Sequence, residues 1–237
     1  KIRVITEGFT SNSQFGFSPN RGTVDAIFIV RQIIEKARER GVKLHLNFID
    51  FKSAFDTIWR EALWNMLRAI GVNNKTVKII ENMYSKTLCS VVIDGYKTEW
   101  FEVLIGVRQG CLLSSTLFNV FLDFVMEEVN CLNKDLTFED NLNMDLKYAD
   151  DDTLIASIFE LLQLSTTQLE KLCEKFGMKV NGDKCKLFTE DQRNIILDDL
   201  AIEKANSFVF LGSQVPGTSN DVKRRIALAA NAFGNLK

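Results

Sequence analysis

Three consecutive aspartates interrupt a segment that otherwise has the composition of a buried strand, LKYADDDTLIA at residues 146–156. Burying carboxylates at this density is costly unless a cation compensates their charge. The flanking stretches, MDLKYA and TLIAS, predict two short strands joined by a tight turn at Asp150 and Asp151. An acidic pair by itself also fits an ordinary polar turn. Other acidic residues in the chain are therefore needed to indicate a metal site.

The rest of the chain predicts an α+β fold in which an antiparallel sheet packs on helices. Apolar periodicity predicts helices at residues 23–41, 61–71, 74–86, 115–130 and 160–177. Strand patterns occur at residues 43–50, 184–188 and 207–215, besides the two strands that flank the aspartates. The first of these alternates as a half-buried strand does.

Two elements can be predicted in more detail. The helix at 23–41 is expected to begin with Thr23 as its N-cap and to end at Gly41. Its expected apolar face holds Val24, Ile27, Phe28, Ile34 and Ala37. Residues 90–103 have the pattern of a β-hairpin, and the Asp94–Gly95 pair suits a type I′ turn.

The composition suits one large domain or two lobes, because 46% of the 237 residues are hydrophobic. The chain begins at Lys1 and ends in a helical pattern, so we expect a piece of a longer protein. Five scattered cysteines without a CxxC pair, beside one histidine, argue against a zinc site or a disulfide framework and suit a reducing compartment. No apolar run reaches bilayer-spanning length, and no signal-peptide layout is present.

The charge is distributed unevenly along the chain. A net charge of −2 by itself speaks against a nucleic-acid partner. However, residues 1–46 carry eight Lys and Arg against four Asp and Glu, whereas residues 134–160 carry two against eight. A basic region beside a concentrated acidic patch is compatible with a metal site that handles phosphates.

A second acidic position lies far upstream of the triplet. Asp50 ends the strand predicted at 43–50, so its carboxylate would meet Asp150 and Asp151 if the strands are neighbours. Oxygen ligands without His or Cys select Mg²⁺ or Mn²⁺, and substrate phosphates complete the coordination of such an ion. Two such ions can support in-line phosphoryl transfer. For nearby Asp56 we favour a structural role, as the N-cap of the next helix.

Six ordered motifs, which cover nearly the whole chain, resemble the reverse transcriptases of non-LTR, LINE-type retrotransposons. Three resemble palm motifs: FIDFKSAFD at 48–56, GVRQGCLLSSTLFN at 106–119 and YADD at 148–151. QFGFSPNRGTVDAIF at 14–28 resembles the fingers segment that precedes them. GMKVNGDKCKLF at 177–188 and FVFLG at 208–212 resemble the two motifs that follow. The resemblance implies a right-hand polymerase fold with fingers and palm.

The resemblance also implies roles for the acids. Asp50 and Asp150 would be the principal ligands of two Mg²⁺ ions, with Mn²⁺ as a possible substitute, and Asp151 the third acid. Without metal, these acids should repel one another and raise at least one pKa. Asp152 has no counterpart in the motif, and strand alternation points it away from Asp151, so we expect it to be a spectator charge.

Further residues would contact the nucleotide. Phe55 falls where the family has a bulky residue that crowds the sugar 2′ position and favours dNTPs, although a Phe of this kind is more often core. Gln109 and Gly110 would lie near the nucleotide and template, where glycine permits close approach, or form an ordinary loop turn. Arg21 would meet the triphosphate or template, although an isolated Arg is usually a surface residue.

Other residues would act at the primer and the leaving group. Lys184 matches the lysine that would protonate pyrophosphate, but VNGDKC also reads as an Asn-Gly hairpin. Tyr148 would pack near the primer end or serve as an ordinary strand aromatic. Phe210, Leu211 and Gly212 would support the primer end, and their alternative is a strand with a glycine turn.

The match has two departures and an incomplete domain set. Ser18 stands where the family usually has Arg, and Ser115 where it usually has Pro. We predict a partial fingers segment at 1–46 and a palm with inserted fingers helices at 47–205. A primer-grip-like hairpin and the start of a truncated thumb are predicted at 206–237, and no endonuclease or RNase H is visible in the sequence.

The implied activity is that of a nucleotidyltransferase, an RNA-directed DNA polymerase within a retrotransposon polyprotein. Its partners would be an RNA template, a DNA primer and dNTPs. The parent polyprotein would add an endonuclease and a thumb, and no membrane partner is expected. It would work inside the cell, in the nucleus or cytoplasm, as a ribonucleoprotein. Two alternatives remain: a decayed or co-opted copy that binds nucleic acid without polymerising, and a palm-fold RNA-dependent RNA polymerase, which Phe55 and YADD disfavour.

Overall fold

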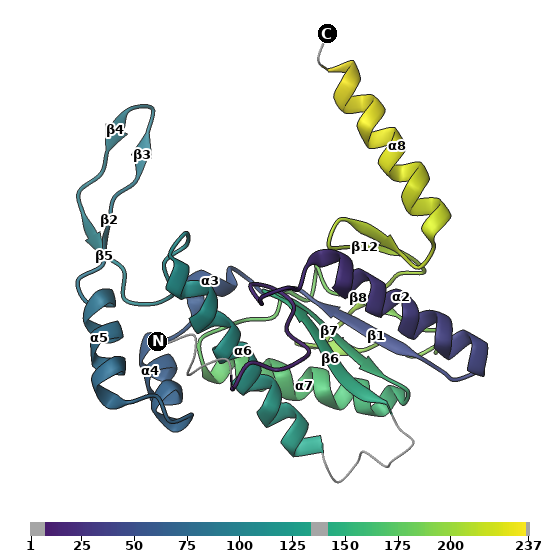
Figure 1. The fold of residues 1–237 in the computed structure, drawn as a ribbon, viewed down its shortest axis with the longest axis horizontal. Helices are drawn as coiled ribbons and strands as arrows, with labels where there is room; N and C mark the ends of the chain where they lie inside the picture. Colours follow the sequence, from purple (N-terminus) through teal and green to yellow (C-terminus); the bar gives the residue numbers. More distant parts are fainter. Residues whose placement is uncertain (1–7, 134–141, 236–237) are drawn as a thin grey trace.

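A computed structural model describes residues 8–133 and 142–235 of the chain. Its centre is a five-stranded sheet in the order β11-β8-β1-β7-β6 (Figure 1). These strands are β1 (His45–Ile49), β6 (Asn143–Tyr148), β7 (Asp151–Ala156), β8 (Lys186–Phe188) and β11 (Glu203–Lys204). All neighbours are antiparallel except β11 and β8, so the predicted α+β class and antiparallel sheet are confirmed.

Helices make up about half of the described residues outside this sheet. They are α2 (Thr23–Arg40), α3 (Ala54–Thr57), α4 (Arg60–Ala69), α5 (Asn74–Tyr84), α6 (Leu112–Asn133), α7 (Phe159–Lys175) and α8 (Thr218–Gly234). Every long helix predicted from periodicity is present. Among the described residues, no helix is long and apolar enough to cross a membrane.

Strand β1 lies in the middle of the sheet and is buried along its whole length. Leu46 and Phe48 face a core that includes α2, whereas Ile49 faces a larger core that includes α6 and α7. The expectation of a half-buried strand is therefore wrong. Alternation is visible in the sequence, but a second layer on the other face buries the residues that would otherwise be exposed.

Helix α2 covers one face of the sheet, and the predicted apolar face is confirmed at Ile27 and Ile34 but wrong at Val24 and Phe28. Its buried residues are Ala26, Ile27, Val30 and Ile34. Val24 and Phe28, which were expected on that face, are 75% and 60% exposed. Gly41 ends the helix at φ 64°, as predicted, but Gly22 is the N-cap and Thr23 is the first helical residue.

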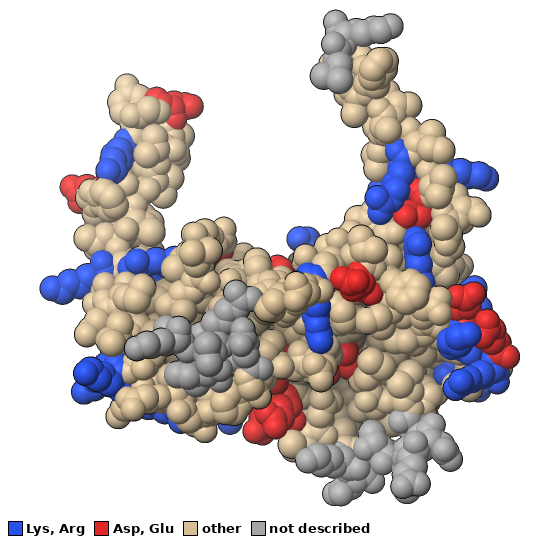
Figure 2. All heavy atoms as spheres, in the orientation of Figure 1, with Lys and Arg blue, Asp and Glu red and all other residues tan. Residues whose placement is uncertain are grey.

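Two projections rise from the same side of the molecule and leave an open channel between them (Figures 1 and 2). One is a β-ribbon made of β2 (Leu88–Cys89), β3 (Val92–Ile93), β4 (Tyr96–Lys97) and β5 (Phe101–Glu102). The predicted Asp94–Gly95 turn is confirmed, with φ of 51° and 85°, the two positive values that a type I′ turn requires. The other projection is α8.

The C-terminal third adds two small hairpins. They are β9 (Ile196–Leu197) with β10 (Leu200–Ala201), and β12 (Phe208–Phe210) with β13 (Ser213–Val215). The strand pattern at 207–215 is thus a hairpin that turns at Leu211 and Gly212, both of which have positive φ. Phe208 and Phe210 pack against Phe48 of β1, which brings this hairpin onto the sheet.

Candidate active site

The acidic triplet lies at the end of the β6–β7 hairpin. Ala149 and Asp150 form the turn, and Asp151 and Asp152 are the first residues of β7. Strand β1 pairs with β7 so that Ile49 stands opposite Asp152, which places Asp50 beside Asp151. The strands that carry Asp50 and Asp151 are therefore neighbours, which was the condition for their carboxylates to come together.

One cavity of about 470 Å³ brings together half of the predicted site residues. It is lined by residues from four distant parts of the chain, including Asp50, Asp151, Lys184, Phe210, Leu211 and Gly212. Lys184 is exposed, and its Nζ lies 4.0 Å from the Asp50 carboxylate. Asp50 also accepts a 3.0 Å hydrogen bond from Asn181 Nδ2, a contact that the sequence motifs did not suggest.

The acids at this cavity are electrostatically coupled. Loss of hydration raises the pKa of Asp151 to about 6, and repulsion from Asp150 and Asp50 adds to the rise. The expectation that clustered acids raise at least one pKa is confirmed. Burial contributes most to this rise, and both other carboxylates add to it.

A divalent cation would relieve this repulsion. Asp50, Asp150 and Asp151 supply only oxygen donors, the kind that Mg²⁺ and Mn²⁺ prefer. Within residues 8–133 and 142–235, no three His, Cys, Asp or Glu side chains already stand in a metal-holding arrangement. A cation held by few carboxylates would therefore depend on substrate phosphates to complete its coordination.

Other predicted residues lie outside this cavity. Gln109 donates hydrogen bonds of 2.9 and 3.0 Å to the Asp56 carboxylate, and both residues line a separate cavity at the base of the ribbon. Gly110 is exposed beside them, with φ 79°. Asp56 lies in α3 and Trp59 is the N-cap of α4, so the N-cap prediction for Asp56 is wrong.

Phe55 and Arg21 both contact the loop that precedes α2. Phe55 is half-buried, stacks on Phe118 at 4.4 Å and meets Phe17 edge-on at 6.4 Å. Arg21 hydrogen-bonds the carbonyls of Asn12 and Gln14. Phe55 thus has the core contacts of its structural alternative, whereas Arg21 is half-buried and bonded to the loop rather than a simple surface residue.

The remaining predicted positions have ordinary contacts. Tyr148 is half-buried against the core that contains α2. Ser18 Oγ donates a 2.9 Å hydrogen bond to the Gln14 carbonyl, and Ser115 Oγ donates one of 3.2 Å to Leu112 inside the first turn of α6. Both serines are therefore accommodated by local hydrogen bonds.

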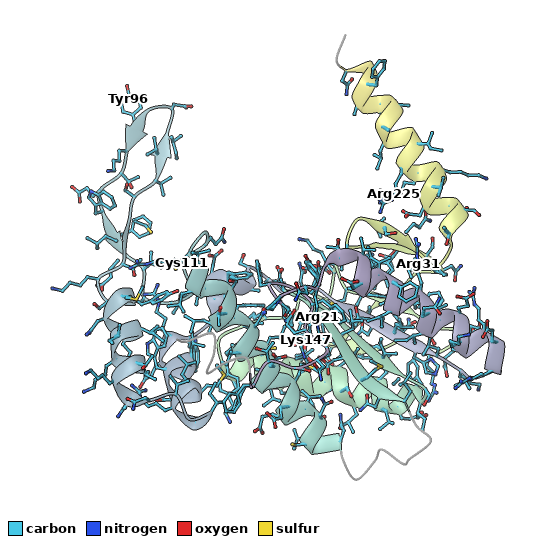
Figure 3. All side chains as sticks on the ribbon, viewed as in Figure 1. Arg21, Arg31, Tyr96, Cys111, Lys147 and Arg225 are labelled. Carbon is cyan, nitrogen blue, oxygen red and sulfur yellow. The ribbon has the colours of Figure 1, made fainter. Side chains whose placement is uncertain are left out.

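A buried ionic cluster on the other face of the β6–β7 hairpin was not predicted. Lys147 is 1% exposed at the centre of the molecule (Figure 3). Its ammonium group hydrogen-bonds Asp145 and lies 3.0 Å from a carboxylate oxygen of Asp123 on α6. Asp152 stands directly across from Lys147 in the hairpin and is also 1% exposed. Alternation together with a two-residue turn could have revealed this pairing from the sequence.

A single cation cannot balance three buried carboxylates, and the pKa values reflect this. Burial opposes both charges of the closest pair, but their attraction prevails, lowering the pKa of Asp145 and raising that of Lys147. Burial raises the pKa of Asp123, and burial with repulsion from Asp145 raises that of Asp152 to about 8. Asp152 is buried among Lys147, Asp145 and Asp123, and its expected lack of a role in the acidic site stays a prediction.

Asp152 should make the stability of the chain depend on pH. Its pKa of about 8 in the folded state exceeds the unfolded value of about 3.9, so folding is favoured when the carboxyl is protonated. We expect the free energy of unfolding to decline from pH 4 to pH 8, and Asp152→Asn to reduce that decline, in urea titrations. Asp183→Asn, at an exposed carboxylate, is the control, and equal slopes for wild type and Asp152→Asn would contradict the assignment.

Comparison with known proteins gives one family. Residues 2–215 match the family model described as reverse transcriptase (RNA-dependent DNA polymerase). The chain is 27% identical over 225 residues to the Retrovirus-related Pol polyprotein from type-2 retrotransposable element R2DM of Drosophila melanogaster, covering 94% of this chain and 21% of that protein. It is 23% identical over 210 residues to the RNA-directed DNA polymerase from mobile element jockey of the same organism, covering 84% and 22%.

Solved structures show the same fold. Apo telomerase from Candida tropicalis, truncated from its C-terminal domain, superposes with a TM-score of 0.64 at 16% identity, over 90% of this chain and 42% of that one. Telomerase from Candida albicans, in complex with a fragment of telomeric RNA, gives 0.63 at 16% identity over 92% and 35%. The chain spans about a fifth of the length of the retrotransposon relatives.

Proposed function

Because the chain belongs to the reverse transcriptase family, we propose that it forms the fingers and palm of an RNA-directed DNA polymerase in a LINE-type retrotransposon polyprotein. The observation that carries this proposal is the shared cavity, in which Asp50, Asp151 and Lys184 meet the Phe210–Gly212 turn. Metal-ligand, leaving-group and primer positions of the family pattern are thus adjacent in space although they are far apart in sequence.

The proposed division of labour follows the fold. Residues 1–46 and the helices inserted in 47–205 would be fingers, the five-stranded sheet would be the palm, and residues 206–237 would begin the thumb. The open channel between the ribbon and α8 would receive an RNA template with its DNA primer (Figure 2). The parent polyprotein would act in the nucleus or cytoplasm as a ribonucleoprotein.

Catalysis would consist of positioning and charge neutralisation. Asp50, Asp150 and Asp151 would hold two Mg²⁺ ions, or Mn²⁺ in their place, and these ions supply charge stabilisation for the attacking and leaving oxygens. Lys184, next to Asp50 and open to solvent, would donate a proton to the departing pyrophosphate. Gln109, Gly110 and Arg21 would orient the nucleotide and template, and Tyr148, Phe210, Leu211 and Gly212 the primer end.

Primer extension tests this proposal. The parent polyprotein, given an RNA template, a DNA primer and Mg²⁺, should add dNTPs and use rNTPs poorly. Retained RNA binding without extension would favour the decayed or co-opted copy, and efficient use of rNTPs would favour an RNA polymerase. Asp50→Ala beside wild type separates this active site from a contaminating polymerase.

Phe55 should set the choice of sugar. Its ring is held by Phe118 at 4.4 Å, so it cannot easily move away from a 2′-hydroxyl. Phe55→Ala is expected to raise rNTP use relative to dNTP use about tenfold or more, because removing a clash abolishes discrimination against the larger sugar. The measurement is kcat/KM for matched dNTP and rNTP.

Phe17→Ala is the matched control, since it removes another ring of the same aromatic contact set from an exposed position. An unchanged rNTP to dNTP ratio in Phe55→Ala would exclude Phe55 from sugar selection. Thermal unfolding of both variants separates this effect from the loss of core stacking.

A further inference from the structure

The segment before α2 pairs with the strand that leads to the catalytic turn. Lys147 donates its backbone N–H to the Ser13 carbonyl at 2.9 Å, and Phe15 donates to the Lys147 carbonyl at 2.7 Å. Gln14 and Lys147 thereby form a parallel bridge at the outer edge of β6. Residues 13–16 therefore run directly toward Ala149 and Asp150.

Gln14 bridges this segment and the catalytic turn. Its side chain is fully buried, and its Oε1 accepts two backbone hydrogen bonds, at 2.8 Å from Gly16 N–H and at 3.2 Å from Ala149 N–H. Ala149 immediately precedes Asp150. The amide of the residue before a metal-ligand position is thus held by a side chain 135 residues away in sequence.

Gly16 completes the contact by its lack of a side chain. A Cβ at this position would lie 2.1 Å from the Ala149 nitrogen and 2.8 Å from its Cα. On the other side, the Gly16 carbonyl accepts a 2.8 Å hydrogen bond from Asn119 Nδ2 of α6. Gly16 thereby packs backbone to backbone on the catalytic turn, and the Asn119 side chain ties the same residue to α6.

The turn needs such support. Ala149 has φ 59°, a left-handed conformation that disfavours residues with a Cβ, and Asp150 has no positive φ. A positive φ at the first central residue alone is the pattern of a type II′ turn, where glycine is usual. Strained conformations of this kind persist where surrounding contacts determine them.

We propose that Gln14 is a positioning residue for catalysis. Its side chain accepts a hydrogen bond from the Ala149 N–H where Gly16 lets the two segments approach closely, and this contact fixes the turn that presents Asp150. This inference rests on the proposed polymerase function for its catalytic consequence. The contact itself rests on hydrogen bonds and burial alone, so the two can be tested separately.

The first experiment measures the contact without activity. In wild type, amide hydrogen exchange of Ala149, followed by NMR on this chain, should be slow. Gln14→Leu should accelerate it about tenfold or more, because the amide loses its acceptor. Gln163→Leu is the matched control, since the Gln163 side chain on α7 likewise accepts a backbone hydrogen bond, at 2.8 Å, but from Ile196 N–H and not from the turn. It should leave Ala149 exchange unchanged.

The second experiment measures the consequence in the parent polyprotein. Gln14→Leu should lower kcat for dNTP addition about tenfold or more, because small misplacements of catalytic groups are costly, and should leave KM for the primer–template within about twofold. Combined with Ala149→Gly, which adopts the positive φ without strain, Gln14→Leu should lose less activity than it does alone. This non-additivity would not arise from a general loss of stability.

Gly16→Ala gives an independent test of the close approach. Its new methyl group would collide with backbone atoms, so we expect a kcat loss at least as large as that of Gln14→Leu. Gly22→Ala in the same loop is the control, since its Cβ would meet nothing nearer than 3.7 Å and its φ is −134°.

Three outcomes would overturn the proposal. Unchanged Ala149 exchange in Gln14→Leu would refute the contact, and a strictly additive double variant would refute its link to the turn. A Gln14→Leu variant that unfolds more readily but keeps wild-type kcat would show a purely structural role. By contrast, a wild-type polyprotein that adds no dNTP would overturn the proposed function, and with it the catalytic role of Gln14, whatever the exchange result.

Discussion

Asp150→Asn is expected to lower the rate of dNTP addition by about 10³-fold or more, while primer–template binding is retained. The substitution keeps the shape of the side chain and removes one of the charges that would hold the two metal ions. Loss of several kcal/mol of charge stabilisation in the transition state corresponds to a factor of this size. Single-turnover primer extension by the parent polyprotein in Mg²⁺ measures it.

Glu99→Gln, at an exposed carboxylate on the ribbon, is the control for charge removal away from the cavity and should keep wild-type activity. Extension that survives in Asp150→Asn at the wild-type rate would remove Asp150 from the catalytic assignment. Replacing Mg²⁺ by Mn²⁺ in the same assay shows whether the residual activity depends on the ion.

Lys147→Met is expected to lower the free energy of unfolding by about 3–5 kcal/mol, the range for removing one partner of a buried ion pair. The side chain is 1% exposed, and its removal leaves Asp123 and Asp145 buried without their cation. Protonation of these acids would recover part of the loss, so the effect should be smaller at low pH. Urea unfolding at pH 5 and pH 8 measures both.

Lys36→Met is the matched control, because Lys36 pairs with Glu39 at 2.8 Å on the exposed side of α2. Exposed pairs of this kind contribute about 0–1 kcal/mol. If Lys147→Met were no more destabilising than Lys36→Met, the cluster would not need its cation. The predicted stabilising role of Lys147 in the buried cluster would then be wrong.

Much of the candidate site could be predicted because its residues act within short motifs. Asp50, Asp151, Lys184 and the Phe210–Gly212 turn were named from the sequence, and the structure places them around one cavity. The Asp94–Gly95 turn was equally local, since a two-residue turn with two positive φ values demands such residues.

The errors share a different cause. The burial of β1 and of two residues on α2 was predicted wrongly, because burial depends on which layer covers an element. Strand β1 is covered on both faces, whereas Val24 and Phe28 are exposed. Asp56 was assigned to a helix cap, but its carboxylate binds Gln109, which is 53 residues away. Periodicity reports which residues share a face and not what that face meets.

The sequence by itself determined the family, the α+β class and the identity of the acids at the turn, because these are encoded in residue order, spacing and side-chain chemistry over a few positions. Only the tertiary structure decided that Lys147 neutralises carboxylates of α6 and β6, and that Gln14 reaches the Ala149 amide. The Gln14 contact joins segments 135 residues apart, and the Lys147–Asp123 contact joins a strand to a helix that packs on the sheet. Such polar contacts are strong only where water is excluded and each group has its partner, and this requires that the layers have packed.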